Sequence, residues 1–108
     1  MKTYTDLEQS KKLAEILPLE SADMWFANGI IVARDSVNEP DDIQSVSPCW
    51  SLAALLGVIP EPDLVQNSEG TWLIRSWVNA YPWSVGGYSN TVDACVAMIE
   101  KLHEQNLL

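Results

Sequence analysis

Few side chains in this sequence of 108 residues could carry out nucleophilic or acid–base chemistry. His103 is the only histidine, and it falls in the last turn of a predicted helix, where the helix dipole favours a partial positive charge. Cys49 and Cys95 both lie within apolar helical patterns, and neither stands in a recognisable nucleophile signature. A hydrolase built on a Cys49–His103 dyad is therefore the least favoured hypothesis, and the sequence predicts no catalytic residue.

The best candidate for a cation site is a predicted acidic loop that contains Asp35, Glu39, Asp41 and Asp42. Their spacing does not match the calcium loop of an EF-hand, and the required glycine is missing. Two cysteines and one histidine are too few for a zinc site. Gly86-Gly87 is not followed by the lysine of a phosphate-binding loop. We therefore expect no metal and no cofactor, and we interpret the acidic cluster as a solvated loop.

The net charge of −9 is concentrated in the middle of the chain. Residues 35–70 hold seven acidic and no basic side chains. Direct nucleic-acid binding requires lysine and arginine to displace counterions, so we expect none, and an anionic membrane surface would repel this chain. The acidity indicates either solvated loops that favour solubility or an acidic surface for a basic partner. An inhibitor that imitates nucleic acid, and so occupies a host DNA-binding protein, is the alternative function.

Five tryptophans are more than the core of one small domain needs. In the predicted strand 71–79, Arg75 and Trp77 share one face, and Trp83 lies just across the following turn. Exposed together, these groups would form an aromatic and arginine patch of the kind that anchors protein interfaces. The other interpretation is that the rings cover the second face of a thin sheet. The candidate interface residues are Trp72, Arg75, Trp77, Trp83, Asp35, Glu39, Asp41 and Asp42.

The first half of the chain predicts a helix over residues 6–17, with Thr5 as its N-cap and Glu8 completing a capping box. Residues 24–34 are rich in aromatic and β-branched residues, which predict a strand around residues 30–34. For the residues before Asn28 this composition leaves open whether they form a second strand. Asn28-Gly29 indicates either a hairpin turn between two short arms or a bulge within one long strand. Residues 35–46 are polar and acidic, which indicates a loop.

The segment from Ser47 to Pro60 predicts a short helix of about ten residues. Ser47 suits an N-cap and Pro48 suits the first helical position, whereas Gly57 and Pro60 indicate the end. Residues 61–70 form a second predicted loop.

Residues 71–79 and 83–88 read as strands, and Pro82 together with the double glycine indicates that the second lies at a sheet edge. The last helix is capped by Asn90 or Thr91 and carries a continuous apolar stripe. The predicted order is helix, strand, helix, strand, strand, helix. These elements predict a single α+β domain over residues 1–108, with a small antiparallel sheet of about three strands and three helices packed mainly on one face.

Three segments resemble the small acidic, uncharacterised proteins encoded by bacterial phages and mobile genetic elements. They are residues 48–56 closed by Pro60, residues 93–104, and residues 13–18. The resemblance implies a compact accessory protein of the bacterial cytoplasm. The function of that family is unknown, so no catalytic or binding residue is carried over.

The leading hypothesis is a non-enzymatic accessory protein that acts by binding another protein, and a homo-oligomer is possible. The longest apolar run, residues 52–59, is far shorter than the roughly 20 residues that span a bilayer. The N-terminus has no apolar signal-peptide core, so we expect a cytoplasmic protein without a membrane partner.

Overall fold

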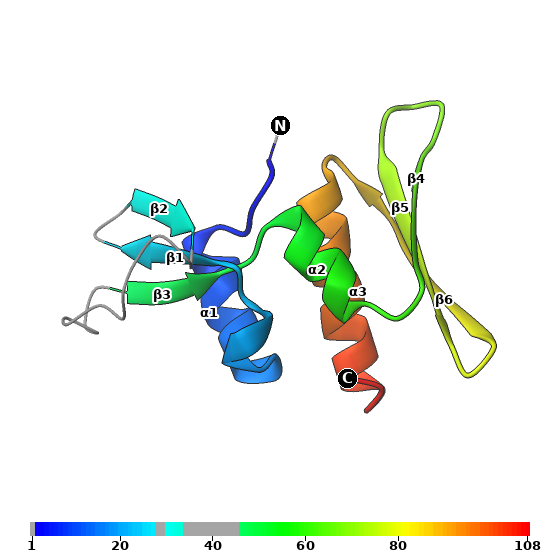
Figure 1. Cartoon of the computed structure of the whole chain (residues 1–108). Helices are drawn as coiled ribbons and strands as arrows, with labels where there is room; N and C mark the ends of the chain where they lie inside the picture. Colours follow the sequence, from blue (N-terminus) through cyan, green and yellow to red (C-terminus); the bar gives the residue numbers. More distant parts are fainter. Residues whose placement is uncertain (1, 28–29, 34–45) are drawn as a thin grey trace.

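The computed structural model describes residues 2–27, 30–33 and 46–108, and it confirms the α+β class (Figure 1). The described elements are α1 (Leu7–Ile16), the 3-10 helix η1 (Leu19–Ser21), β1 (Met24–Ala27), β2 (Ile30–Ala33), β3 (Val46–Cys49), α2 (Leu52–Val58), β4 (Pro62–Gln66), β5 (Trp72–Val78), β6 (Tyr81–Tyr88) and α3 (Thr91–Glu104). The strands form two antiparallel sheets, ordered β2-β1-β3 and β4-β5-β6. The prediction of a single three-stranded sheet is therefore wrong.

Helix α1 begins one residue later than predicted, with Asp6 and not Thr5 as its N-cap. The Gln9 amide donates to Asp6 Oδ1 over 2.8 Å, and the Asp6 amide donates to Gln9 Oε1 over 3.1 Å, which completes a capping box. Thr5 is fully buried, and its hydroxyl lies 2.8 Å from Ser10 Oγ. The Thr5 hydroxyl is thus committed to an internal contact, and the exposed carboxylate of Asp6 caps the helix instead.

Strands β1 and β2 form a hairpin, which decides between the two interpretations of Asn28-Gly29. Ala27 pairs with Ile30, so only two residues connect the strands, and the alternative of a bulge within one long strand is wrong. The connecting residues themselves lie outside the described part of the chain. Most of the predicted loop 35–46 also lies outside it, and only Val46 is described, as the first residue of β3.

The predicted start of the second helix at Ser47-Pro48 is wrong, because both residues belong to β3. Pro48 pairs with Trp25 on an edge strand, a position that tolerates the missing amide proton. The true N-cap of α2 is Ser51, whose hydroxyl accepts from the Ala54 amide over 3.2 Å. The helix is therefore seven residues long, and it begins five residues after the predicted start at Ser47.

The predicted loop over residues 61–70 is also partly wrong, because Pro62–Gln66 forms β4 and pairs with β5. Strand β5 is confirmed, and so is the edge position of β6. Strand β6 begins at Tyr81, before the predicted start at residue 83, because Asn79 and Ala80 alone make the turn. Their φ angles of 52° and 64° are typical of the tight turn that joins two hairpin strands.

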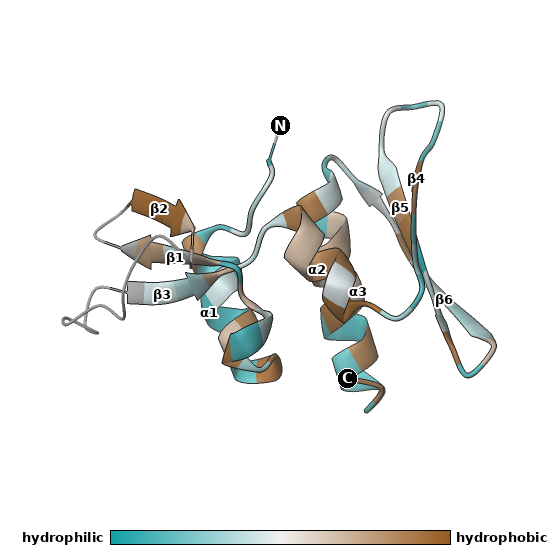
Figure 2. Ribbon diagram, viewed as in Figure 1, coloured by the Kyte–Doolittle hydropathy of each residue, from teal (hydrophilic) through white to brown (hydrophobic). Residues whose placement is uncertain are grey.

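The three helices are divided between the two sheets, and they do not cover one sheet together. Helix α1 lies against β3, whereas α3 covers β5 and β6 and packs on α2 (Figure 1). The apolar stripe of α3 is buried as predicted. Figure 2 shows that apolar residues dominate α2 and recur along α3. One buried cluster unites both halves of the chain and includes Leu13, Leu17, Trp50, Leu55, Ile74, Cys95, Met98 and Leu102.

Candidate functional site

The sheet β4-β5-β6 has two unlike faces. Its inner face, which includes Trp72, Ile74, Ser76 and Val78 of β5, is turned toward α3 and α2. The outer face carries the alternate residues, because successive side chains of a strand point to opposite sides. Figure 1 shows this sheet nearly edge-on, with helices on one side and no described element against the other.

The outer face presents apolar side chains on either side of an ion pair. Trp77 is 42% exposed near one end of β5, and Val65 of β4 is 38% exposed toward the other end. Between them, Arg75 of β5 donates to the carboxylate of Asp63, its register partner on β4. The outer face of the described sheet is thus a mixed aromatic, aliphatic and charged surface with no excess charge.

The structure separates the four predicted interface residues of the strands into two pairs. Arg75 and Trp77 share the outer face, as their spacing predicts. Trp72 and Trp83 lie on the inner face and pack against the buried cluster. Trp83 is the register partner of Ser76, which is fully buried, so its ring cannot join Trp77.

The Trp83 ring instead belongs to a cluster on the inner face, near the turn that joins β5 to β6. Its centroid lies 5.3 Å from that of Tyr81, and Lys101 Nζ of α3 lies 5.8 Å from its centroid. The same ammonium donates to the Ser84 carbonyl over 3.0 Å. A cation over an aromatic face adds electrostatic attraction to the packing, so this cluster fastens α3 to β6.

The other four predicted interface residues, Asp35, Glu39, Asp41 and Asp42, lie outside the described residues. Conversely, Asp63 and Val65 belong to the outer face but were missed in the sequence, because the segment that holds them was read as a loop. The local signal for this strand is the adjacent apolar pair Leu64-Val65, which is too short to show the period of two that marks a half-buried strand.

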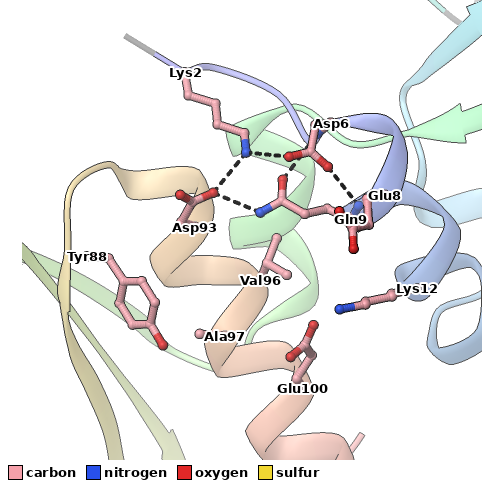
Figure 3. Close-up of a pocket in the computed structure, with 10 residues that line it drawn as sticks. All are labelled: Lys2, Asp6, Glu8, Gln9, Lys12, Tyr88, Asp93, Val96, Ala97 and Glu100. Atoms are coloured by element: carbon pink, nitrogen blue, oxygen red, sulfur yellow. Dashed lines mark hydrogen bonds and ion pairs between the residues drawn. The ribbon is translucent and has the colours of Figure 1, made fainter.

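A second candidate region is a cavity of about 400 Å³ between the N-terminal ends of α1 and α3 (Figure 3). Lys2 Nζ lies 3.0 Å from the Asp6 carboxylate and 2.9 Å from that of Asp93. Gln9 Nε2 also donates to Asp93 over 2.8 Å. The N-cap residue of α1 and the first turn of α3, distant in sequence, are therefore tied together by one ammonium group.

The pKa shifts of this network follow from those contacts. Burial alone would lower the pKa of Lys2, but its hydrogen bonds to Asp93 and Asp6 outweigh burial and raise it. The Gln9 amide bond and then Lys2 lower the pKa of Asp6. Burial opposes ionisation of Asp93, yet bonds from Lys2, Gln9 and Asn90 lower its pKa. All three groups stay charged near neutral pH, so the network acts as a permanent electrostatic tie.

The rest of this cavity is lined by Tyr88, Val96 and Ala97, with Lys12 and Glu100 pointing toward one another across it (Figure 3). Among the described residues that line it, none carries a thiol or an imidazole. Because the charges at one end satisfy one another, we interpret the cavity as the seam between α1 and α3.

The two thiols are buried, whereas the imidazole of His103 is exposed. Cys49 is fully buried, where desolvation raises the pKa of its thiol despite contacts with the Thr5 hydroxyl. Burial raises the pKa of Cys95 to about 12. His103 is exposed, and its Nδ1 lies 3.1 Å from the Leu108 carbonyl oxygen. In the described part of the chain, no three His, Cys, Asp or Glu side chains are grouped so that they could hold a metal ion.

Comparisons with protein-family models, with curated proteins and with solved structures give no match to this chain. The resemblance to phage and mobile-element proteins therefore stays a prediction. No helix among the described residues is long and apolar enough to cross a membrane.

Proposed function

We propose that this protein acts by binding another protein through the outer face of the sheet β4-β5-β6. The observation that carries the proposal is the exposure of Trp77, at 42%, on a sheet face that no described element covers. Tryptophan and arginine are, with tyrosine, the residues enriched at the energetic centres of protein interfaces. Trp77 and Arg75 supply these two residue types at neighbouring positions on the same face of β5.

The geometry of the face favours binding at a low entropic cost. Trp77 is held on the central strand of the sheet, paired in register with Pro82 of β6. Arg75 is already oriented by Asp63, so fewer rotamers are lost when a partner docks. The role proposed here is that of a non-enzymatic accessory protein, working in the cytoplasm of a bacterium that carries the phage or mobile element.

A comparison of single variants tests the proposal. Wild-type protein, Trp77→Ala and Tyr81→Ala are immobilised, and proteins captured from a bacterial lysate are quantified by mass spectrometry at low and high salt. Tyr81 is the matched control because it is a more exposed aromatic residue, at 62%, whose position in register with Val78 places it on the inner side.

We expect a specific partner to be lost with Trp77→Ala and retained with Tyr81→Ala, at both salt concentrations. Equal capture by Trp77→Ala and wild type would overturn the assignment of the outer face. Capture that survives Trp77→Ala but disappears at high salt would instead support the alternative, an acidic mimic of nucleic acid.

A further inference from the structure

The two edge strands of the sheet β4-β5-β6 differ in the backbone groups that they leave free. In an antiparallel ladder, residue pairs alternate between those that exchange hydrogen bonds and those whose N–H and C=O groups point away from each other. On an edge strand, the residues of the second kind present their backbone groups to the outside. These groups are the template on which another strand can pair.

The edge of β6 is closed. Asn79 and Ala80 form a two-residue turn, so Val78 and Tyr81 make a bonded pair, and the alternation turns Pro82 and Ser84 outward. Pro82 has no N–H, and the Ser84 carbonyl accepts from Lys101 Nζ over 3.0 Å. Beyond them, the ladder is interrupted by a register shift.

The edge of β4 is open. The Asn67 amide donates to the Thr71 carbonyl over 2.9 Å, so the same alternation places Val65 in a bonded pair with β5. Leu64 and Gln66 then present both N–H and C=O to the outside. Within the described part of the chain, no side chain donates to or accepts from these four groups.

The charge around this edge selects what can pair with it. Glu61, Asp63 and Glu69 lie in or beside β4, and Arg75 balances only Asp63. A second copy of this chain would bring like charges together on two chains of net charge −9. An extended segment rich in lysine or arginine would be attracted to the same edge.

We propose that the open edge of β4 accepts an extended, basic segment of a partner protein as a fourth strand. The segment pairs with the N–H and C=O groups of Leu64 and Gln66, and its alternate side chains extend the outer face beyond Val65. This inference rests on the proposed function, because it names the partner segment that a protein-binding sheet would take.

The test uses a nine-residue peptide of alternating lysine and valine, with a glutamate–valine peptide of equal length as the charge control. Binding is followed through the backbone amide signals of the ¹⁵N-labelled full chain. We expect the amides of Leu64 and Gln66 to shift and to become protected from solvent exchange when the basic peptide binds. The acidic peptide should leave them unchanged.

Two variants at one position isolate the edge backbone. Gln66→Pro removes an outward N–H without breaking a β4–β5 bond, and Gln66→Ala removes the side chain while keeping that N–H. We expect Gln66→Pro to weaken peptide binding by up to about tenfold, as the loss of one backbone hydrogen bond implies, and Gln66→Ala to change it by less than about twofold. A peptide N-methylated only on the edge that faces β4 should also fail to bind, which tests pairing without altering the protein.

Several results would overturn the inference. They are equal binding of the peptide by Gln66→Pro and wild type, tolerance of the N-methyl groups, and equal binding of the acidic peptide. A dimer in light scattering that Gln66→Pro disrupts would show that the occupant is a second copy. A natural partner that is lost with Trp77→Ala but kept with Gln66→Pro would overturn the edge site and leave the outer-face function standing.

Discussion

Each of the two faces of β5 carries one tryptophan, yet the two faces differ in how far they are covered by the rest of the molecule. On the inner face, Ile74 and Ser76 are fully buried beneath α3. One residue away in each case, Arg75 is exposed and Trp77 is 42% exposed. The difference shows that strand parity, and not side-chain type, decides which aromatic groups of this chain are available to a partner.

The largest effect should come from truncating the inner face. Ile74→Ala removes a fully buried side chain from the shared core, and we expect a loss of about 2–4 kcal/mol in the free energy of unfolding. The matched control is Leu73→Ala on the outer face, where we expect a loss of less than about 1.5 kcal/mol because Leu73 is only partly buried. Urea unfolding of both variants measures the contrast, and equal losses would contradict the division into two faces.

Because α3 packs over the inner face of the sheet, we expect the thiol of Cys95 to be protected from alkylating reagents. Cys95 lies fully buried on α3 with a pKa raised to about 12 by burial, so its thiolate is scarce in the folded state at pH 8. We expect alkylation by iodoacetamide at pH 8 to be slower than in the urea-unfolded chain by at least about a hundredfold. Mass spectrometry of each cysteine peptide measures the rate. Rapid labelling of Cys95 in the folded chain would mean that α3 lifts readily from the sheet.

The raised pKa of Cys95 also makes the free energy of unfolding depend on pH, and it should fall as the pH rises. The folded state holds the Cys95 proton above the ordinary thiol pKa, so its contribution to stability is complete below about pH 8.5. That contribution should be lost as the pH rises from there toward 12. Cys95→Val should unfold with a shallower pH dependence over this range than the wild type.

A smaller effect should come from the fastening of α3 to the β6 edge. Lys101→Met keeps most of the aliphatic stem but loses the cation above Trp83 and the bond to the Ser84 carbonyl. We expect a loss of about 0.5–1 kcal/mol in the free energy of unfolding. Lys11→Met, at an exposed position of α1, removes the same charge away from this sheet and serves as the control. If both variants lost equal stability, the effect would be one of net charge.

Much of the arrangement of helices and strands could be predicted from the sequence. The elements that were missed share one cause. The stripe of α3 and the alternation of β5 are local periodic patterns, so both were predicted. Strand β3 was missed because Pro48 was interpreted as the first residue of a helix, and β4 because residues 61–70, which include Pro62, were interpreted as a loop. Both prolines occupy edge strands. An edge position depends on the partner strand, which a local pattern does not contain.

The candidate site shows the same limit. The shared face of Arg75 and Trp77 follows from spacing within one strand. The face of Trp83 depends on the register between β5 and β6, which the two-residue turn at Asn79 and Ala80 sets. That turn places Trp83 opposite Ser76, so a ring expected beside Trp77 is turned to the other side of the sheet.

The smallest effect should come from the ion pair on the outer face, and it separates binding from stability. Arg75 and Asp63 are each almost half exposed, so their attraction is screened and Arg75→Met should change the free energy of unfolding by no more than about 0.5 kcal/mol. If the outer face is the binding surface, the same variant should weaken partner capture far more than it weakens the fold. Arg75→Lys keeps the charge but not the planar guanidinium, so it distinguishes a requirement for charge from one for geometry. A loss of stability as large as that of Ile74→Ala would show instead that Arg75 belongs to the packed part of the molecule.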